Sequence, residues 1–294
     1  HTKKVLASIG GLGELSMGGI INPSAWKEGD NYKMILRVDE NLEGYKGRKE
    51  KARCRPFLAE YDDRFNLISL VQLEGDDKRL IEDWRVYYSD QDYLHGGCAI
   101  WDGEKWKQGH FEVNRLFNSW SPFKEYSSDK NQKNWGFFDV GRCWEYYVYS
   151  VEPFVVRDSD TRMVATHDFN SGWDADGFIS CSTYPQKYGN DYLMWVHKKQ
   201  KDLTYLNSVM IFDGETFEPK YFIPHHVLGS EGIDQPLYIS SCLVEDDRIL
   251  IFGGEGGIPE MSNAALKHST VRIIDRTIFD NLIKQYPCQP NKNS

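Results

Sequence analysis

Short runs of β-branched and aromatic residues follow one another along almost the whole chain, and helical periodicity is nearly absent. Asp-Gly pairs such as Asp102-Gly103 and Asp213-Gly214 stand between apolar runs. Such runs are typical of strands, and Asp-Gly pairs are typical of hairpin turns. The chain therefore predicts a succession of antiparallel hairpins. The clearest strand runs lie at 32–38, 66–73, 144–150, 191–197, 204–212 and 248–254, with further turns at Asp62-Asp63 and Asp246-Asp247.

A long series of hairpins must pair, cover or close its strand edges, which leaves a sandwich, a barrel or a propeller. Four strands of about six residues with their turns need about 50 residues, so a chain of 294 residues predicts about five propeller blades. We expect a single all-β domain over 1–294, with blades over roughly 16–275. Only 276–286 carries an apolar stripe at helical spacing, so a short helix and a tail are expected at 276–294.

The composition limits the classes of function. A net charge of -9 disfavours a nucleic-acid surface, although it is compatible with a local basic pocket for a phosphate. No apolar run reaches the roughly 18 residues of a membrane-spanning helix, and the amino terminus has no signal-peptide core. The six cysteines lack paired spacing and predict buried free thiols. We expect a cytoplasmic protein without a metal or cofactor, although the start at His1 leaves room for a removed upstream anchor.

Polar clusters interrupt the predicted strands at intervals of roughly one blade. In the second cluster, Glu82, Asp83 and Arg85 surround Trp84. Regular alternation places Asp83 and Arg85 on one face of a strand and Glu82 with Trp84 on the other. A surface ion pair explains one such doublet, but the inner strands of a propeller bring recurring clusters together on its axis. We therefore expect an axial pocket formed by Asn22, Asp83, Lys133 and His197.

Taken together, the clusters resemble those of five-bladed β-propeller carbohydrate-active enzymes. The resemblance is closest to glycoside hydrolase family 130, the β-mannoside phosphorylases, and to related mannosyltransferases. INPSAWKEGDNYKMILRVDE (21–40) is similar to the family's first-blade Asn-Pro and its strand ending in Arg and an acid. EDWR (82–85) looks like the second-blade Glu-Asp-Pro-Arg, with Trp84 in place of proline. QKNWGFFDVGRCWEYYVYSVEP (132–153) resembles the third-blade Lys-Asn segment, and His197 with Tyr205 resembles the fourth-blade pair.

The resemblance implies inverting chemistry at the anomeric carbon of a β-linked sugar, most often mannose, by a phosphorylase or a glycosyltransferase. Asp83 matches the general acid, which must hold a proton for the leaving oxygen. That task requires a raised pKa, which burial favours and Arg85 alone opposes. Phosphate or a phosphosugar is expected at Lys133, His197 and Tyr205, and the sugar at Asn22, Arg37, Asp39, Arg85, Asn134, Trp135 and Glu255. The implied partners are a mannoside, a sugar phosphate or a sugar nucleotide, and inorganic phosphate.

Two other functions stay open. An inverting hydrolase needs a second carboxylate to activate water, and the first-blade position carries Asn22 instead of an aspartate. Glu231, Asp234 and Glu255 remain candidate bases. A non-catalytic glycan-binding propeller would bind sugars without releasing a product.

Several residues also have simpler structural explanations. Arg37 could pair with Asp39 or Glu40 between strands. His225-His226 lacks a third metal ligand at a telling spacing, and the glycine-rich segments 8–19 and 253–257 lack the strand-to-helix context of a nucleotide-binding loop. Trp84, Trp135 and Trp173 could stack on sugars or fill the space between blades.

Overall fold

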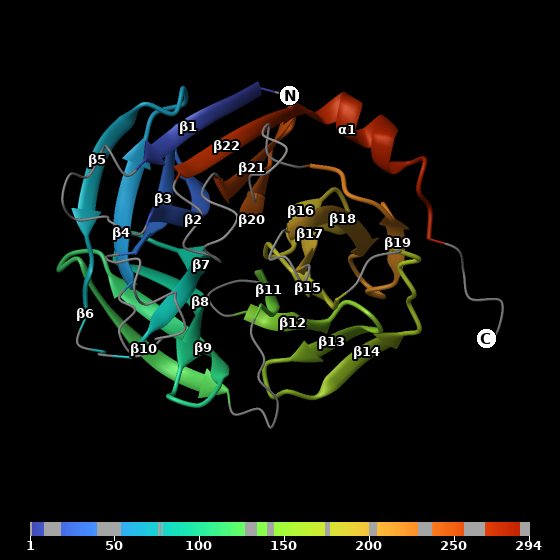
Figure 1. The fold of residues 1–294 in the computed structure, drawn as a ribbon, viewed down its shortest axis with the longest axis horizontal. Coiled ribbons are helices and arrows are strands. Elements are labelled where there is room, and N and C mark those ends of the chain that lie inside the picture. The colour runs from blue at the N-terminus through green and yellow to red at the C-terminus, as the bar shows by residue number, and fades with distance from the viewer. Residues whose placement is uncertain are drawn as a thin grey trace.

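The computed structural model describes residues 2–8, 19–39, 54–75, 77, 79–126, 134–139, 144–173, 177–199, 205–228, 237–255 and 268–288. Their strands form five sheets arranged in a ring, a five-bladed β-propeller (Figure 1). The expected fold class is confirmed.

The first three blades are meanders that run outward from the axis. The first blade contains β2 (Gly19–Glu28), β3 (Asn31–Asp39), β4 (Cys54–Tyr61) and β5 (Leu67–Gln72). The second contains β7 (Ile81–Ser89), β8 (Tyr93–Trp101), β9 (Trp106–Asn114) and β10 (Ser119–Tyr126), with β6 (Glu74–Gly75) beside β10. The third contains β11 (Gly136–Asp139), β12 (Trp144–Ser150), β13 (Phe154–Asp158) and β14 (Met163–His167).

The last two blades depart from this simple order. In the fourth, β15 (Ile179–Cys181) and β16 (Gln186–Tyr188) both pair with β17 (Asp191–Lys199), followed by β18 (Tyr205–Asp213) and β19 (Pro219–Phe222). The fifth contains β20 (Leu237–Val244), β21 (Arg248–Glu255), β22 (His268–Asp275) and β1 (Thr2–Ser8). Because β1 pairs antiparallel with β22, the two ends of the propeller share one blade and close the ring.

The predicted strands agree closely with the observed ones. The six runs named above correspond to β3, β5, β12, β17, β18 and β21, and the four turn pairs lie between consecutive strands of one blade. The C-terminal helix α1 (Arg276–Ile283) ends three residues before the predicted end at 286. The reason is that the Tyr286 carbonyl accepts a hydrogen bond from the Phe222 amide, which draws this segment onto β19.

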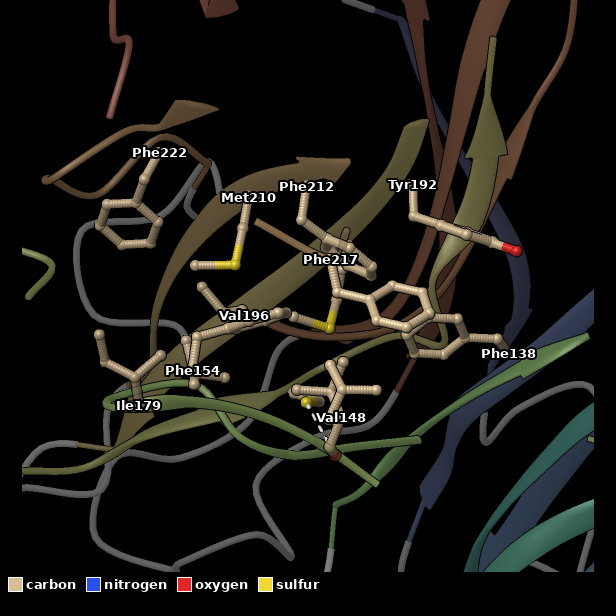
Figure 2. Packing of buried hydrophobic residues seen from close by; sticks show 14 of the residues in the cluster. Phe138, Val148, Phe154, Ile179, Tyr192, Val196, Met210, Phe212, Phe217 and Phe222 are labelled. Atoms are coloured by element: carbon tan, nitrogen blue, oxygen red, sulfur yellow. Dashed lines mark hydrogen bonds between the residues drawn. The ribbon is translucent and has the colours of Figure 1, made fainter. Parts of the chain in front are cut away.

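Large aromatic side chains fill the spaces between blades. Between the third and fourth blades, Phe138 of β11 packs 4.8 Å from the Tyr192 ring and 5.3 Å from the Phe212 ring, measured between centroids. Figure 2 shows these rings with Met210 and Val148 in one continuous apolar cluster. The high aromatic content of the sequence therefore serves mainly to pack sheet against sheet.

The start of α1 offers a test of local stability. The Asp275 carboxylate accepts a hydrogen bond from the Ile278 amide at 3.0 Å and so caps the helix. Asp275→Ala is expected to lower the free energy of unfolding by about 1 kcal/mol, measured by urea denaturation. Asp246→Ala, in an exposed turn, is the matched control and should change it little. Equal effects of the two substitutions would show that the cap contributes nothing.

Candidate active site

A cavity of about 70 Å³ lies at one end of the propeller axis, and all five blades contribute to its wall. The described residues that line it are Ile21, Asn22, Arg37, Glu82, Asp83, Asn134, His197, Lys199, Tyr205 and Tyr238. The structure therefore brings Asn22, Asp83 and His197 together, as the spacing of the clusters predicts. Lys133, the fourth residue of the expected axial pocket, lies outside the described residues.

Three of these side chains share an unusual backbone conformation. Asn22, Asp83 and Asn134 have left-handed φ values of 51°, 57° and 69°. Asparagine and aspartate adopt this conformation more readily than other residues with a Cβ. In the first two blades it coincides with a β-bulge, since the register shifts between Ile21 and Ser24 and between Glu82 and Arg85. Bulges re-aim side chains, so corresponding points of three successive blades present a polar group to the cavity.

The bulge at Asp83 breaks the alternation that the sequence predicts. Glu82 was expected on the face opposite Asp83, but both carboxylates line the cavity. Trp84 instead turns into the core beside the second blade, where its ring meets Trp120 edge to face at a centroid distance of 5.8 Å. Trp84 therefore packs between blades and does not line the pocket.

The two acids share one buried cation. Arg37, on β3, places Nη1 2.9 Å from Glu82 Oε2 and 3.3 Å from Asp83 Oδ1. Asn22 Nδ2 donates a further hydrogen bond to Asp83 Oδ1 at 2.6 Å. All four side chains are buried. These contacts hold the Asp83 carboxylate in one orientation at the cavity wall. They also show that Arg37 pairs with the second-blade acids; the Asp39 side chain lies outside the described residues.

Arg85 lies beneath the cavity and organises two of its wall residues. Its Nη2 donates to Asn134 Oδ1 at 3.2 Å and to the Tyr238 hydroxyl oxygen at 2.7 Å. Because a guanidinium can only donate, Asn134 keeps its amide nitrogen for a further hydrogen bond. In Asn22 the amide nitrogen is the group already used, because Nδ2 donates to Asp83, whereas the buried Oδ1 has no hydrogen-bond partner among the described residues. The Asn134 amide is therefore a donor that a sugar hydroxyl in the cavity could use.

The fourth blade supplies the opposite wall. His197 Nδ1 lies 2.8 Å from the Ser182 hydroxyl, and its ring packs at 5.5 Å from Tyr205 and 5.1 Å from Tyr238. Lys199 also lines the cavity, with Nζ 5.7 Å from the centre of the Tyr205 ring. Sequence reasoning missed Lys199 and Tyr238. Lys199 could have been found from its spacing, because residues i and i+2 of a strand share a face and His197 was already a candidate.

Two other predicted sugar ligands lie away from the cavity. Glu255 is buried on β21, where Oε1 accepts from Arg272 Nη2 at 2.9 Å and from Lys3 Nζ at 3.3 Å. Trp135 is stacked on Tyr147 with ring centroids 4.7 Å apart. Trp173, which could have stacked on a sugar, is likewise buried and packs beside Phe222. The packing interpretation therefore fits Trp84, Trp135 and Trp173. Glu231 and Asp234 lie outside the described residues.

Other candidate groups have structural partners. His226 Nδ1 accepts a hydrogen bond from the Asn207 amide, and the His225 ring packs on Tyr286. No cluster of three metal-ligating side chains occurs in the described part of the chain, and no helix there is long and apolar enough to cross a membrane. Among the described cysteines, Cys98, Cys181, Cys242 and Cys288 are free thiols, and burial raises the pKa of Cys181 and Cys242 to about 12.

The arrangement can be compared with known proteins. No family model and no curated protein sequence matches the chain. Solved structures match it across most of its length. The β-1,2-mannobiose phosphorylase of Listeria innocua has a TM-score of 0.64 at 10% identity, with 91% of this chain and 92% of that chain covered.

Two further structures extend the comparison. A second structure comes from GH130, a family of mannoside phosphorylases that contains glycoside hydrolases targeting β-1,2 mannosidic linkages in Candida mannan. It has a TM-score of 0.60 at 12% identity, with 94% of this chain and 88% of that chain covered. The RS223 β-xylosidase has a TM-score of 0.59 at 11% identity, with 92% of this chain and 94% of that chain covered. The chain thus has the five-bladed propeller fold that is found in GH130 mannoside phosphorylases and in related glycoside hydrolases.

Proposed function

We propose that this protein makes or breaks β-mannoside-type glycosidic bonds by an inverting mechanism, with phosphate or a phosphosugar as the second reactant. The observation that carries the proposal is the Asp83 carboxylate, which Asn22 and Arg37 hold at an axial cavity lined by all five blades. An acid positioned in this way can protonate the oxygen of a departing sugar. The fold shared with mannoside phosphorylases supports the same class of substrate.

The charges around the cavity favour an anionic reactant. Arg37 and Lys199 line the cavity and Arg85 lies beneath it, whereas the described carboxylates in its wall are Glu82 and Asp83. Among the described residues, three cations therefore face two acids. The excess of positive charge grows further when Asp83 carries its proton. Such a site stabilises a phosphate group beside the anomeric carbon.

The same residues argue against hydrolysis. An inverting hydrolase places its two carboxyl groups roughly 6.5–9.5 Å apart, so that a water molecule fits between the sugar and the base. Here Glu82 and Asp83 are adjacent and share Arg37 Nη1. Glu255 is held by Arg272 away from the cavity. A phosphate nucleophile needs no such base. The described residues of the cavity wall therefore suit phosphorolysis or the reverse reaction.

In the proposed step, a phosphate oxygen attacks the anomeric carbon of a β-mannoside from the face opposite the leaving group. The bond from that carbon to the glycosidic oxygen breaks, and its electron pair goes to the oxygen. Asp83 donates the proton that this oxygen takes up. The products are α-mannose 1-phosphate and the shortened sugar. The reverse reaction uses α-mannose 1-phosphate as the donor and returns the proton to Asp83.

The test is to incubate the protein with β-1,2-mannobiose, with and without inorganic phosphate, and to follow mannose 1-phosphate and mannose by NMR. Release of α-mannose 1-phosphate only when phosphate is present is the expected result. Mannose released equally without phosphate would identify a hydrolase instead. A parallel reaction with GDP-mannose and mannobiose detects a glycosyltransferase. Binding of mannobiose with no product in any reaction would indicate a glycan-binding propeller and overturn the proposal.

Glu82 gives a prediction about pH dependence. The charged groups around Asp83 are Glu82 and Arg85 on its own strand, Arg37 on β3 and Lys199 on β17, with His197, Tyr205 and Tyr238 as further titratable neighbours. Glu82 neutralises the Arg37 guanidinium that contacts Asp83. Glu82→Gln removes that compensation, so Asp83 releases its proton more readily.

The alkaline limb of the kcat/KM profile should therefore move to lower pH by about one unit. Glu125→Gln is the control, because Glu125 pairs with Arg79 in a solvent-exposed position. Its profile should match that of the unmodified protein. An unshifted alkaline limb in Glu82→Gln would mean that Glu82 does not influence the acid.

A further inference from the structure

A second, larger cavity of about 440 Å³ lies at the other end of the propeller axis. It is lined by the later parts of the same inner strands, for example Trp26 of β2 and Tyr87 of β7, whereas Asn22 and Asp83 near the starts of these strands line the first cavity. Figure 1 shows these inner strands around the centre of the ring. The size falls within the range of small-molecule pockets.

The wall of this second cavity combines aromatic rings with cations. Phe137, Tyr184 and Tyr192 are buried and contribute rings, and Trp26, Tyr87 and Tyr88 are half-buried. Two lysines, Lys27 and Lys187, lie at its exposed rim. None of the described residues that line the cavity is acidic. The wall thus suits a ligand with a ring face and a negative charge.

The two lysines differ in their partners. Lys27 Nζ is 2.9 Å from Glu245 Oε1, so its charge is already compensated. Lys187 Nζ lies 3.9 Å from the centre of the Tyr192 ring, and no carboxylate among the described residues lies within 4 Å of it. Its charge therefore lies over the Tyr192 ring at the rim of the cavity, where an anionic group can contact it.

Arg85 and Tyr184 are neighbours, and each is connected to a different cavity. Arg85 is buried and bonds to Asn134 and Tyr238, which face the first cavity. Tyr184 lines the second. Burial raises the pKa of Tyr184 well above its usual value, although the nearby Arg85 lowers it, so the hydroxyl stays protonated. The second cavity is therefore lined by residues other than those of the first cavity.

We propose that the second cavity binds an anionic sugar. The C–H face of the sugar ring packs on the aromatic wall, and its phosphate or carboxylate group contacts Lys187. This site stands independently of the proposed function, because it uses none of the residues of the first cavity.

The test is isothermal titration with mannose 1-phosphate and with glucuronic acid, which present the two kinds of anionic group, and with neutral mannose and inorganic phosphate alone. At least one anionic sugar should bind, and Lys187→Glu should weaken that binding by about tenfold or more. Lys284→Glu, an exposed lysine at the end of α1, is the matched control and should leave the affinity unchanged. A crystal soaked with the same sugar should show its anionic group within hydrogen-bonding reach of Lys187 Nζ.

The outcomes separate this site from the catalytic proposal. If the protein proves inactive on mannosides, a Lys187-dependent binding event should persist. If neutral mannose binds as tightly as the anionic sugar, the proposed role of Lys187 is wrong. If inorganic phosphate alone binds as tightly as the anionic sugar, the proposed role of the aromatic rings is wrong. No binding, binding that is indifferent to Lys187→Glu, or a sugar seen only in the first cavity overturns the proposal as a whole.

Discussion

Asp83→Asn is expected to lower turnover of a β-mannoside with a poor leaving group by at least about 100-fold while the propeller stays folded. Asparagine has nearly the shape of aspartate, and its side-chain oxygen can still accept hydrogen bonds from Asn22 Nδ2 and Arg37 Nη1, which now contact Asp83 Oδ1. It cannot donate the proton that the departing oxygen needs. Steady-state kinetics with β-1,2-mannobiose and phosphate measure the loss, and circular dichroism checks the fold.

Donors with good and poor leaving groups distinguish the loss of a general acid from a general disturbance of the binding pocket. An activated aryl mannoside or a sugar 1-phosphate needs less protonation, so the defect of Asp83→Asn should be smaller on such a donor. A misplaced side chain would impair all donors alike. Asp246→Asn, in an exposed turn, should retain full activity. Full activity of Asp83→Asn on mannobiose would instead make Asp83 a structural partner of Arg37.

The architecture could be predicted from the sequence because it depends on repeated local signals. Apolar runs of about six residues and Asp-rich turn pairs recur along the chain, and each run became a strand of one blade. Chain length then selected about five blades. The ring closure could not be read in this way, since the pairing of β1 with β22 joins segments about 270 residues apart and no local pattern specifies it.

The site was harder to predict because it depends on irregular backbone. Strand alternation separates Glu82 from Asp83, yet the left-handed bulge brings both to Arg37. The available signal was an asparagine or aspartate within an inner strand, as at Asn22 and Asp83, or just before one, as at Asn134. Trp135 and Glu255 do not line the described cavity, for a different reason. Their residue types suit sugar binding, but inter-blade packing and the Arg272 pair take them away from the cavity.

Arg37→Met should destabilise the protein by about 3–5 kcal/mol at neutral pH, measured by urea denaturation. Methionine fills much of the space of arginine but leaves the Glu82 and Asp83 carboxylates buried without the cation that both contact. Breaking one side of a buried ion pair has a far larger effect than losing a surface pair. Arg79→Met is the comparison, because Arg79 pairs with Asp77 and Glu125 at the surface, and its effect should stay below about 1 kcal/mol.

The pH dependence of this deficit identifies its cause. Without Arg37, the buried carboxylates bind protons more tightly in the folded protein than in the unfolded chain, so stability is lost as pH rises. The difference between Arg37→Met and the unmodified protein should therefore shrink as the pH falls from about 8 to about 5. Adding Glu82→Gln to Arg37→Met should recover part of the stability, because one uncompensated charge is removed. A deficit that is constant with pH and unaffected by Glu82→Gln would mean that Arg37 stabilises the blade by packing alone, and Asp83 would then need another source of its fixed orientation.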